Sequence, residues 1–201
     1  MKLFTLKHLV TVFCILTTAI SYSQTPLTDE NFKIALADCL STHPFYGLCM
    51  DSEYGPMPEW DVSAVTDMSE AFALSNTFNA DISDWDVSNV SKMYSMFRNA
   101  KNFDQDLSNW DVSNVEDMSY MFSFTTFQNP GINDWDVGNV KNMRRMFAYN
   151  LFLIIDLSTW DVSNVKNMHG MFSGSDGFKS DLSAWDVGNV TDMNAMFFLN
   201  S

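Results

Sequence analysis

Aspartates are the residues of this 201-residue chain whose spacing could do chemistry. One column follows the six tryptophans at 25-residue intervals: Asp61, Asp86, Asp111, Asp136, Asp161 and Asp186. A second column is formed by Asp81, Asp106, Asp156 and Asp181. If the repeats stack, neighbouring carboxylates about 5 Å apart repel each other by roughly 1 kcal/mol in water. Some interaction must offset this repulsion.

Two interpretations of the aspartates follow. Each carboxylate could accept backbone N–H groups of the following turn, which would stabilise its charged form. Alternatively, calcium could bind between coils, with ligands from Asp86, Asp111, Asp136, Asp161 and Asp186. Calcium needs six to eight oxygens, and the motif lacks the G-G-x-G-x-D spacing of calcium-binding β-solenoids. The first interpretation is therefore favoured, and calcium is the alternative.

Other chemistry has little support in the sequence. The chain has three histidines (His8, His43 and His169) and no nucleophile elbow, metal triad or phosphate loop. The carboxylates recur in every repeat, whereas an active site is singular. We expect no enzymatic activity and no cofactor.

A 25-residue repeat must position these residues. Trp is followed by Asp, Val, Ser or Gly, Asn and Val, with Ala64 replacing Asn in the first copy. The tryptophans are Trp60, Trp85, Trp110, Trp135, Trp160 and Trp185, with Met eight residues and Phe twelve residues after each. Such a period indicates stacked coils. We expect the tryptophans to form a core ladder.

The spacing inside one repeat predicts its elements. Leu107, Trp110 and Val112 have the spacing of a leucine-rich-repeat strand. Val115, Met118 and Phe122 then fall on one face of a short helix. The predicted fold class is an α/β repeat: a leucine-rich-repeat-like right-handed solenoid with one short strand and one short helix per 25-residue coil and an N-terminal helical cap.

Three segments are expected along the chain. Residues 1–23 have the basic start, apolar run and small residues of a secretory signal peptide. Residues 24–58 are predicted to cap the stack, with a helix over 27–41 that Thr28 can begin. Residues 59–201 hold six repeats, of which the last is incomplete.

Export affects how the cysteines are interpreted. Cys39 and Cys49 are close in sequence, and an oxidising compartment favours a disulfide between them. A loop of this size predicts a contribution of roughly 2–3 kcal/mol. A metal site with His43 is the alternative, but it lacks a fourth ligand.

The repeat F-N-x-D-L-S-x-W-D-V-S-N-V-x-x-M-x-x-M-F resembles the BspA-like leucine-rich-repeat surface proteins of bacteria. The resemblance covers residues 60–201, and 29–59 is similar to the segment that precedes such repeats. It implies an extracellular or cell-surface solenoid involved in adhesion or protein binding, and it does not imply catalysis.

Departures from the repeat are the better indication of a binding site. In the fifth unit, polar loop positions become apolar: Leu151, Phe152, Leu153, Ile154 and Ile155. This predicts either a partner patch or a repacked loop. Arg144 and Arg145, the only adjacent basic pair, are expected to be solvated.

The formal net charge of −14 argues against nucleic acid and anionic membrane as partners. We expect a secreted or bacterial cell-surface protein, not inserted in the membrane after signal cleavage, that binds a protein or glycan. The alternatives are a structural spacer of a larger surface protein and a calcium-stabilised carbohydrate-binding module. The final repeat stops four residues past Phe197, so an uncapped coil and end-to-end association through it are also expected.

Overall fold

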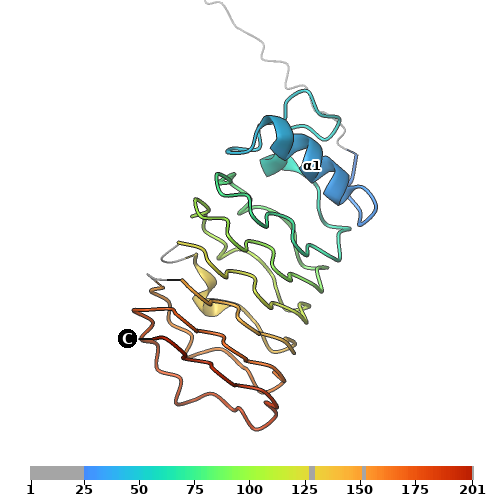
Figure 1. Ribbon diagram of the computed structural model, residues 1–201. Helices are drawn as coiled ribbons and strands as arrows, with labels where there is room; N and C mark the ends of the chain where they lie inside the picture. The colour runs from blue at the N-terminus through green and yellow to red at the C-terminus, as the bar shows by residue number, and fades with distance from the viewer. Residues whose placement is uncertain (1–24, 127–129, 151–152, 201) are drawn as a thin grey trace, which may run out of the picture.

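The chain forms a stack of similar coils with a helix at one end (Figure 1). The computed structural model describes residues 25–126, 130–150 and 153–200. Within these ranges the helical elements are α1 (Phe32–Thr42) and two 3-10 turns, η1 (Met57–Glu59) and η2 (Ile132–Asp134). The predicted signal peptide, residues 1–23, lies outside them. No helix in the described ranges has the length and apolar composition that a membrane crossing requires.

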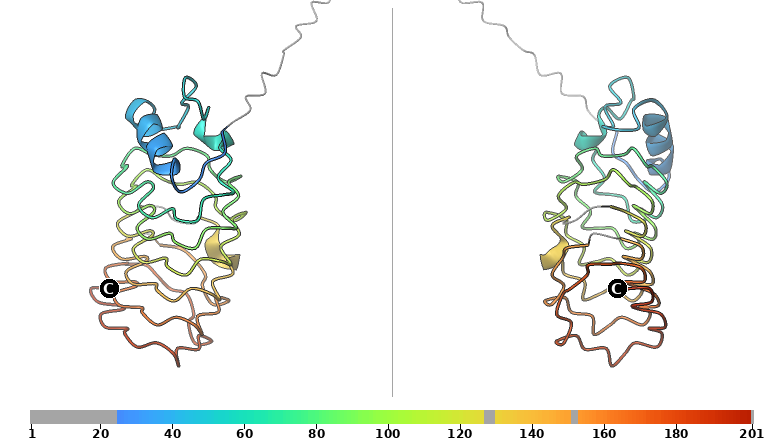
Figure 2. Two further views of the ribbon diagram at one scale, coloured as in Figure 1. Left: turned by 90° about the vertical axis from the view of Figure 1, so that its right-hand side faces the viewer. Right: turned by 60° about the vertical axis from the view of Figure 1, so that its left-hand side comes forward.

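Consecutive coils lie in parallel, one 25-residue repeat apart, as the two views of Figure 2 show. Isolated parallel bridges join residues 25 apart, from Asp67 with Lys92 to Asn167 with Asp192. No bridge in the described part of the chain extends into a strand longer than one residue. The coils are therefore joined by short backbone contacts rather than by a regular sheet.

The prediction of one strand and one helix per coil is wrong, and with it the leucine-rich-repeat architecture. The segment expected to be helical, represented by Val115–Phe122, contains an isolated bridge at Asp117 followed by a run of turns over 119–124. Its backbone N–H groups do not all bond within the coil, since Met118, Tyr120 and Phe122 donate to carbonyls of the next coil at 2.8–3.0 Å. A helix would have directed these donors back along its own chain, so bonding between coils replaces helix formation.

The run of turns contains two left-handed residues per coil, ten and fourteen positions after each tryptophan. In the third coil these are Tyr120 (φ 58°) and Phe124 (φ 60°), and in the fifth they are Gly170 and Gly174. Each is the third residue of a turn closed by an i to i+3 bond, such as Met121 N–H to Met118 O at 3.2 Å. Type II turns require positive φ at this position. The alternation leaves every second N–H free to reach the next coil.

Aromatic ladders fill the interior. The phenylalanines stack with ring centres 5.5–5.9 Å apart, in the pairs 72–97, 97–122, 122–147, 147–172 and 172–197. All six tryptophans are buried, with at most 9% of their surface exposed. From the second coil onward, each indole N–H donates to a carbonyl 28 residues earlier at 2.9–3.2 Å. The indoles therefore contribute both apolar burial and a bond between coils.

Helix α1 covers the first coil at the N-terminal end (Figure 1). It begins at Phe32 rather than 27 because the preceding residues pair with the coil: Leu27 N–H donates to Asp61 O at 2.9 Å, and Thr28 bridges Ala64. Asp29 accepts from the backbone N–H of Thr66 at 2.8 Å. Residues 27–29 therefore bond to backbone groups at the edge of the first coil, where later coils bond to the coil before them.

A disulfide ties α1 to the loop that follows it. Cys39, on the buried face of the helix, is joined to Cys49, with their Cα atoms 5.3 Å apart. His43 lies in the loop that this bond closes, and its Nδ1 is 3.0 Å from the hydroxyl of Thr42.

The left-handed glycines generate a prediction about stability. A Cβ atom on Gly174 would lie 2.7 Å from the Tyr149 ring, and its φ of +68° disfavours any side chain. Gly174→Ala should therefore lower the free energy of unfolding by about 1–2 kcal/mol. Urea unfolding followed by tryptophan fluorescence measures this.

Gly138→Ser is the matched control, because Gly138 has no positive φ and serine occupies the same position in four other repeats. Equal losses in the two variants would contradict the argument from backbone conformation.

Candidate functional site

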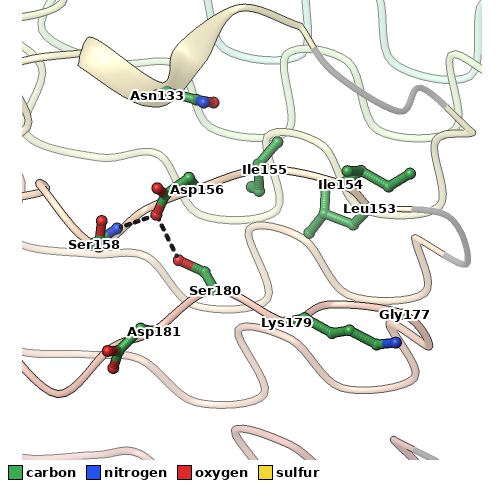
Figure 3. Close-up of a pocket in the computed structure, with 10 residues that line it drawn as sticks. All are labelled: Asn133, Leu153, Ile154, Ile155, Asp156, Ser158, Gly177, Lys179, Ser180 and Asp181. Atoms are coloured by element: carbon green, nitrogen blue, oxygen red, sulfur yellow. Dashed lines mark hydrogen bonds between the residues drawn. The ribbon is translucent and has the colours of Figure 1, made fainter.

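A surface groove lies where the fifth unit departs from the repeat. It has a volume of about 770 Å³ and spans three coils (Figure 3). Three successive segments line it, each about 25 residues after the last: Asn133, then residues 153–156 with Ser158, then Gly177 with residues 179–181. Residues 25 apart face each other here, so Lys179 stands one coil below Ile154, and Asp181 one coil below Asp156.

The predicted apolar patch contributes to this groove in part. Leu151 and Phe152 lie outside the described residues. Leu153 and Ile155 are buried (0% and 7% exposed) and belong to the core. Ile154 is 68% exposed, which makes it the apolar side chain that this segment presents to solvent among its described residues.

Polar groups form the other side of the groove. The carboxylate of Asp156 accepts the backbone N–H of Ser158 at 3.0 Å and the hydroxyl of Ser180 at 3.1 Å (Figure 3). The backbone N–H of Ser158, then its hydroxyl and then the hydroxyl of Ser180 hold the pKa of Asp156 below its usual range. The hydroxyl of Ser180 also accepts the backbone N–H of Leu157 at 2.8 Å. Ser180 therefore joins two coils at the base of the groove.

The groove combines one exposed aliphatic side chain with a lysine and two carboxylates. The Asp181 carboxylate accepts the N–H of Ser183 at 2.9 Å, and this bond lowers its pKa despite the nearby charge of Asp156. The amide oxygen of Asn133 is buried and has no hydrogen-bond partner. This mixture suits contact with a ligand that has both apolar and polar groups.

Sequence spacing had placed Asp156 and Asp181 in a column of aspartates without connecting them to a groove. Lys179 and Ser180 were missed altogether. Aligning the repeats at an interval of 25 residues places Lys179 opposite Ile154. The alignment does not show that a groove lies between them, because this depends on how far each loop extends from the stack.

The aspartate column after the tryptophans is a set of turn-stabilising groups. Each of these carboxylates accepts the backbone N–H two residues later at 2.9–3.1 Å: Asp61, Asp86, Asp111, Asp136, Asp161 and Asp186. Asp81, Asp106, Asp156 and Asp181 do the same. This is the geometry of an Asx turn.

Metal binding has no preformed site in the part of the chain that the structure describes, where no three His, Cys, Asp or Glu side chains are grouped to hold an ion. Each aspartate of the calcium hypothesis instead has one oxygen engaged by its own turn. Calcium between coils stays a prediction that a titration can test.

The asparagine four residues after each tryptophan bonds to the coil before it. From Asn89 to Asn189, its side-chain amide donates to a carbonyl 26 residues earlier at 2.7–2.9 Å. Ala64 occupies this position in the first repeat, where residues 27–28 pair with the coil and no earlier repeat offers that carbonyl. The replacement of asparagine by Ala64 thus has a structural reason.

Comparison with known proteins finds a family. The model of the family described as "Mycoplasma protein of unknown function, DUF285" matches residues 45–150 and 123–201. No curated protein and no solved structure matches the chain. The match supports the predicted membership of a repeat family at a coarse level, whereas the leucine-rich-repeat assignment is corrected by the fold.

The engaged carboxylates predict how the protein responds to calcium. The thermal unfolding midpoint should be the same in millimolar calcium and in chelator, because the Asp111 and Asp136 turns close without an ion. Differential scanning calorimetry on one preparation measures both. A midpoint raised by calcium and restored by chelator would revive the calcium interpretation.

The serines of these turns predict a response to acid. Hydrogen bonds from Ser113 and Ser163, the hydroxyl first and the backbone N–H second, lower the pKa of Asp111 and Asp161. A carboxyl whose pKa is lower in the folded state stabilises the fold above its unfolded pKa of about 4, and the contribution is lost as the pH falls through the folded pKa.

The double variant Ser113→Ala, Ser163→Ala should therefore be less stable than the wild type at pH 7, with a smaller difference at pH 2. Urea unfolding at the two pH values measures this. An equal difference at both would show that the hydroxyls do not act through ionised carboxylates.

Proposed function

The chain belongs to the DUF285 family, and from that premise we propose that it is an exported, non-catalytic repeat protein that binds a protein or glycan ligand at a cell surface. The resemblance to BspA-like surface proteins, apart from their leucine-rich-repeat architecture, stays a prediction that agrees with this role. The predicted signal peptide supports export.

The observation that carries the proposal is the groove around Ile154. A repeat protein buries its apolar side chains between coils, and Ile154 instead has 68% of its surface in solvent beside Asp156 and Lys179. Exposed apolar groups with polar neighbours are typical of binding surfaces. The residues that form the groove depart from the repeat, unlike the carboxylates that recur in every coil.

A binding role also agrees with the chemistry of the repeated residues. The aspartates hold turns, the asparagines join coils, and the tryptophans fill the core. These groups are occupied in building the stack, which supports a scaffold that presents a surface rather than a reaction centre. The alternatives are a spacer in a larger surface protein and a calcium-stabilised carbohydrate-binding module.

Substitution of Ile154 tests the proposal. The labelled secreted protein is titrated onto cells of the producing bacterium and onto a panel of animal cells, and bound label is measured. We expect saturable binding, weakened about tenfold by Ile154→Asn, since loss of one buried aliphatic side chain from an interface removes about 1.5 kcal/mol or more.

Ile34→Asn is the matched control, because Ile34 on α1 is 67% exposed. It should bind like the wild type. Equal weakening by both variants would remove the groove from the proposal. Absence of saturable binding to any cell would favour the spacer, and binding to sugars only with calcium would favour the carbohydrate module.

A further inference from the structure

A cluster of arginines and tyrosines lies on the turns after the methionines of the repeat. We propose that this arginine–tyrosine cluster (Tyr94, Arg98, Tyr120, Arg144 and Arg145) binds an acidic polysaccharide. It shares no residue with the groove around Ile154, so the proposal goes beyond the binding role assigned to that groove.

Tyr120 is at the centre of the cluster. The guanidinium carbons of Arg98 and Arg144 lie 5.8 Å and 5.9 Å from the centre of its ring. Arg144 Nε donates to the Tyr120 hydroxyl at 3.0 Å, and Tyr94 meets the Tyr120 ring edge-on at 6.0 Å. One aromatic ring thus brings together two arginines that are 46 residues apart in the sequence.

The arginines of the cluster form no ion pair with the described part of the chain. Arg98, Arg144 and Arg145 are all the arginines of the chain, which carries a net charge of −14. The two ion pairs among the described residues join Lys141 to Glu116 and His169 to Asp192, and neither includes an arginine. Arg98 and Arg144 meet at the Tyr120 ring, and Arg145 follows Arg144 in the chain. Three guanidinium groups without an ion pair among the described residues, in a protein with an excess of acids, mark a site for an external anion.

The arginines are held along the surface rather than free in solvent, in contrast to the sequence expectation for Arg144 and Arg145. All three are half-buried. The Nε atoms of Arg98 and Arg145 are buried and have no hydrogen-bond partner. The same is true of the hydroxyl of Ser95. Their terminal nitrogens are therefore the groups that can bind a ligand.

The next coil provides space for this arrangement. Gly170 stands one repeat after Arg145, and a Cβ atom on it would lie 3.2 Å from Arg145 Cγ. Gly174 has the same relation to Tyr149, whose ring stacks on Phe124 at 4.5 Å. The two left-handed glycines of the fifth coil thus lie under the large side chains of the fourth.

The chemistry of the cluster selects the ligand class. The planar guanidinium fork binds carboxylate and sulfate groups by paired hydrogen bonds, which makes arginine better suited to this role than lysine. The neighbouring stack of Phe124 and Tyr149 offers an apolar ring face, since Phe124 is 38% exposed. Acid groups and ring faces alternate in a polysaccharide of uronic or sulfated sugars.

The spacing of the coils favours a polysaccharide over a peptide. The core phenylalanines of successive coils lie 5.5–5.9 Å apart, so one coil advances by about the length of one linked pyranose ring. An extended peptide advances by about 3.3 Å per residue and shows the same face every second residue, so its side chains drift out of register with the coils. A chain of acidic sugars along the stack axis would meet Arg98, Tyr120 and Arg144 in turn.

Binding of defined polymers tests the proposal. The secreted protein is titrated, by biolayer interferometry, against immobilised polygalacturonate (carboxylate only), heparin (carboxylate and sulfate), neutral dextran and polyglutamate. We expect binding to at least one of the two acidic polysaccharides, weakening as salt is raised, and none to dextran. Comparing the two shows which acid group is recognised.

The double variant Arg144→Gln, Arg145→Gln should bind at least about tenfold more weakly, because it removes two charged hydrogen-bond donors from the site. Lys101→Gln, Lys166→Gln removes the same charge at two exposed positions and should change binding less than about twofold, the size of a screened surface charge. If the first double variant fails to fold, Arg98→Gln alone serves, with a smaller loss expected.

Three results would overturn the proposal: no binding to either acidic polysaccharide, equal losses in the arginine and lysine variants, or equally tight binding to polyglutamate, which would assign the site to an acidic peptide. Ile154→Asn should leave polysaccharide binding unchanged, so failure of this site and of the groove are distinguishable.

Discussion

The stacking of each coil on the next is the interaction on which the rest of the structure depends. Phe172, covered by the coil that follows it, is fully buried, whereas Phe197 at the same position of the last described coil is 50% exposed. The same contrast holds for Met168 (0%) and Met193 (43%). A coil cannot bury its own apolar residues, so the stability of the protein lies between repeats rather than within them.

Backbone conformation follows from the same constraint. Strands and helices satisfy backbone groups by fixed patterns, but here the turns direct alternate N–H groups to the next coil, and two residues per coil adopt positive φ to allow this. Most of these residues are not glycine, and a side chain in that conformation is disfavoured. The bonds and ring contacts between coils offset that cost at every repeat.

Recurrence separates building groups from binding groups. The Asx-turn carboxylates and the indoles such as Trp110 occur in each coil, and the amides such as Asn114 in each coil that follows another repeat, because the stack needs them there. By contrast, the groove around Ile154 and the arginines around Tyr120 are built from residues that do not recur at the 25-residue interval. Both sites are formed where individual coils carry residues that differ from the repeat. A stacked architecture tolerates such differences because each coil contacts only its neighbours.

The sequence by itself determined the period of 25, the buried ladders and the residues that break the pattern, because packing between coils requires the same side chains at the same interval. It did not determine the secondary structure. The spacing of Val115, Met118 and Phe122 is compatible with a helix, and only the tertiary structure decided for turns, since the competing hydrogen bonds come from another coil. The tertiary structure also decided that Leu153 and Ile155 face inward while Ile154 faces out. In the same way, Arg98 and Arg144 both contact the Tyr120 ring because three coils stack in register. The sequence around each residue alone does not predict this contact.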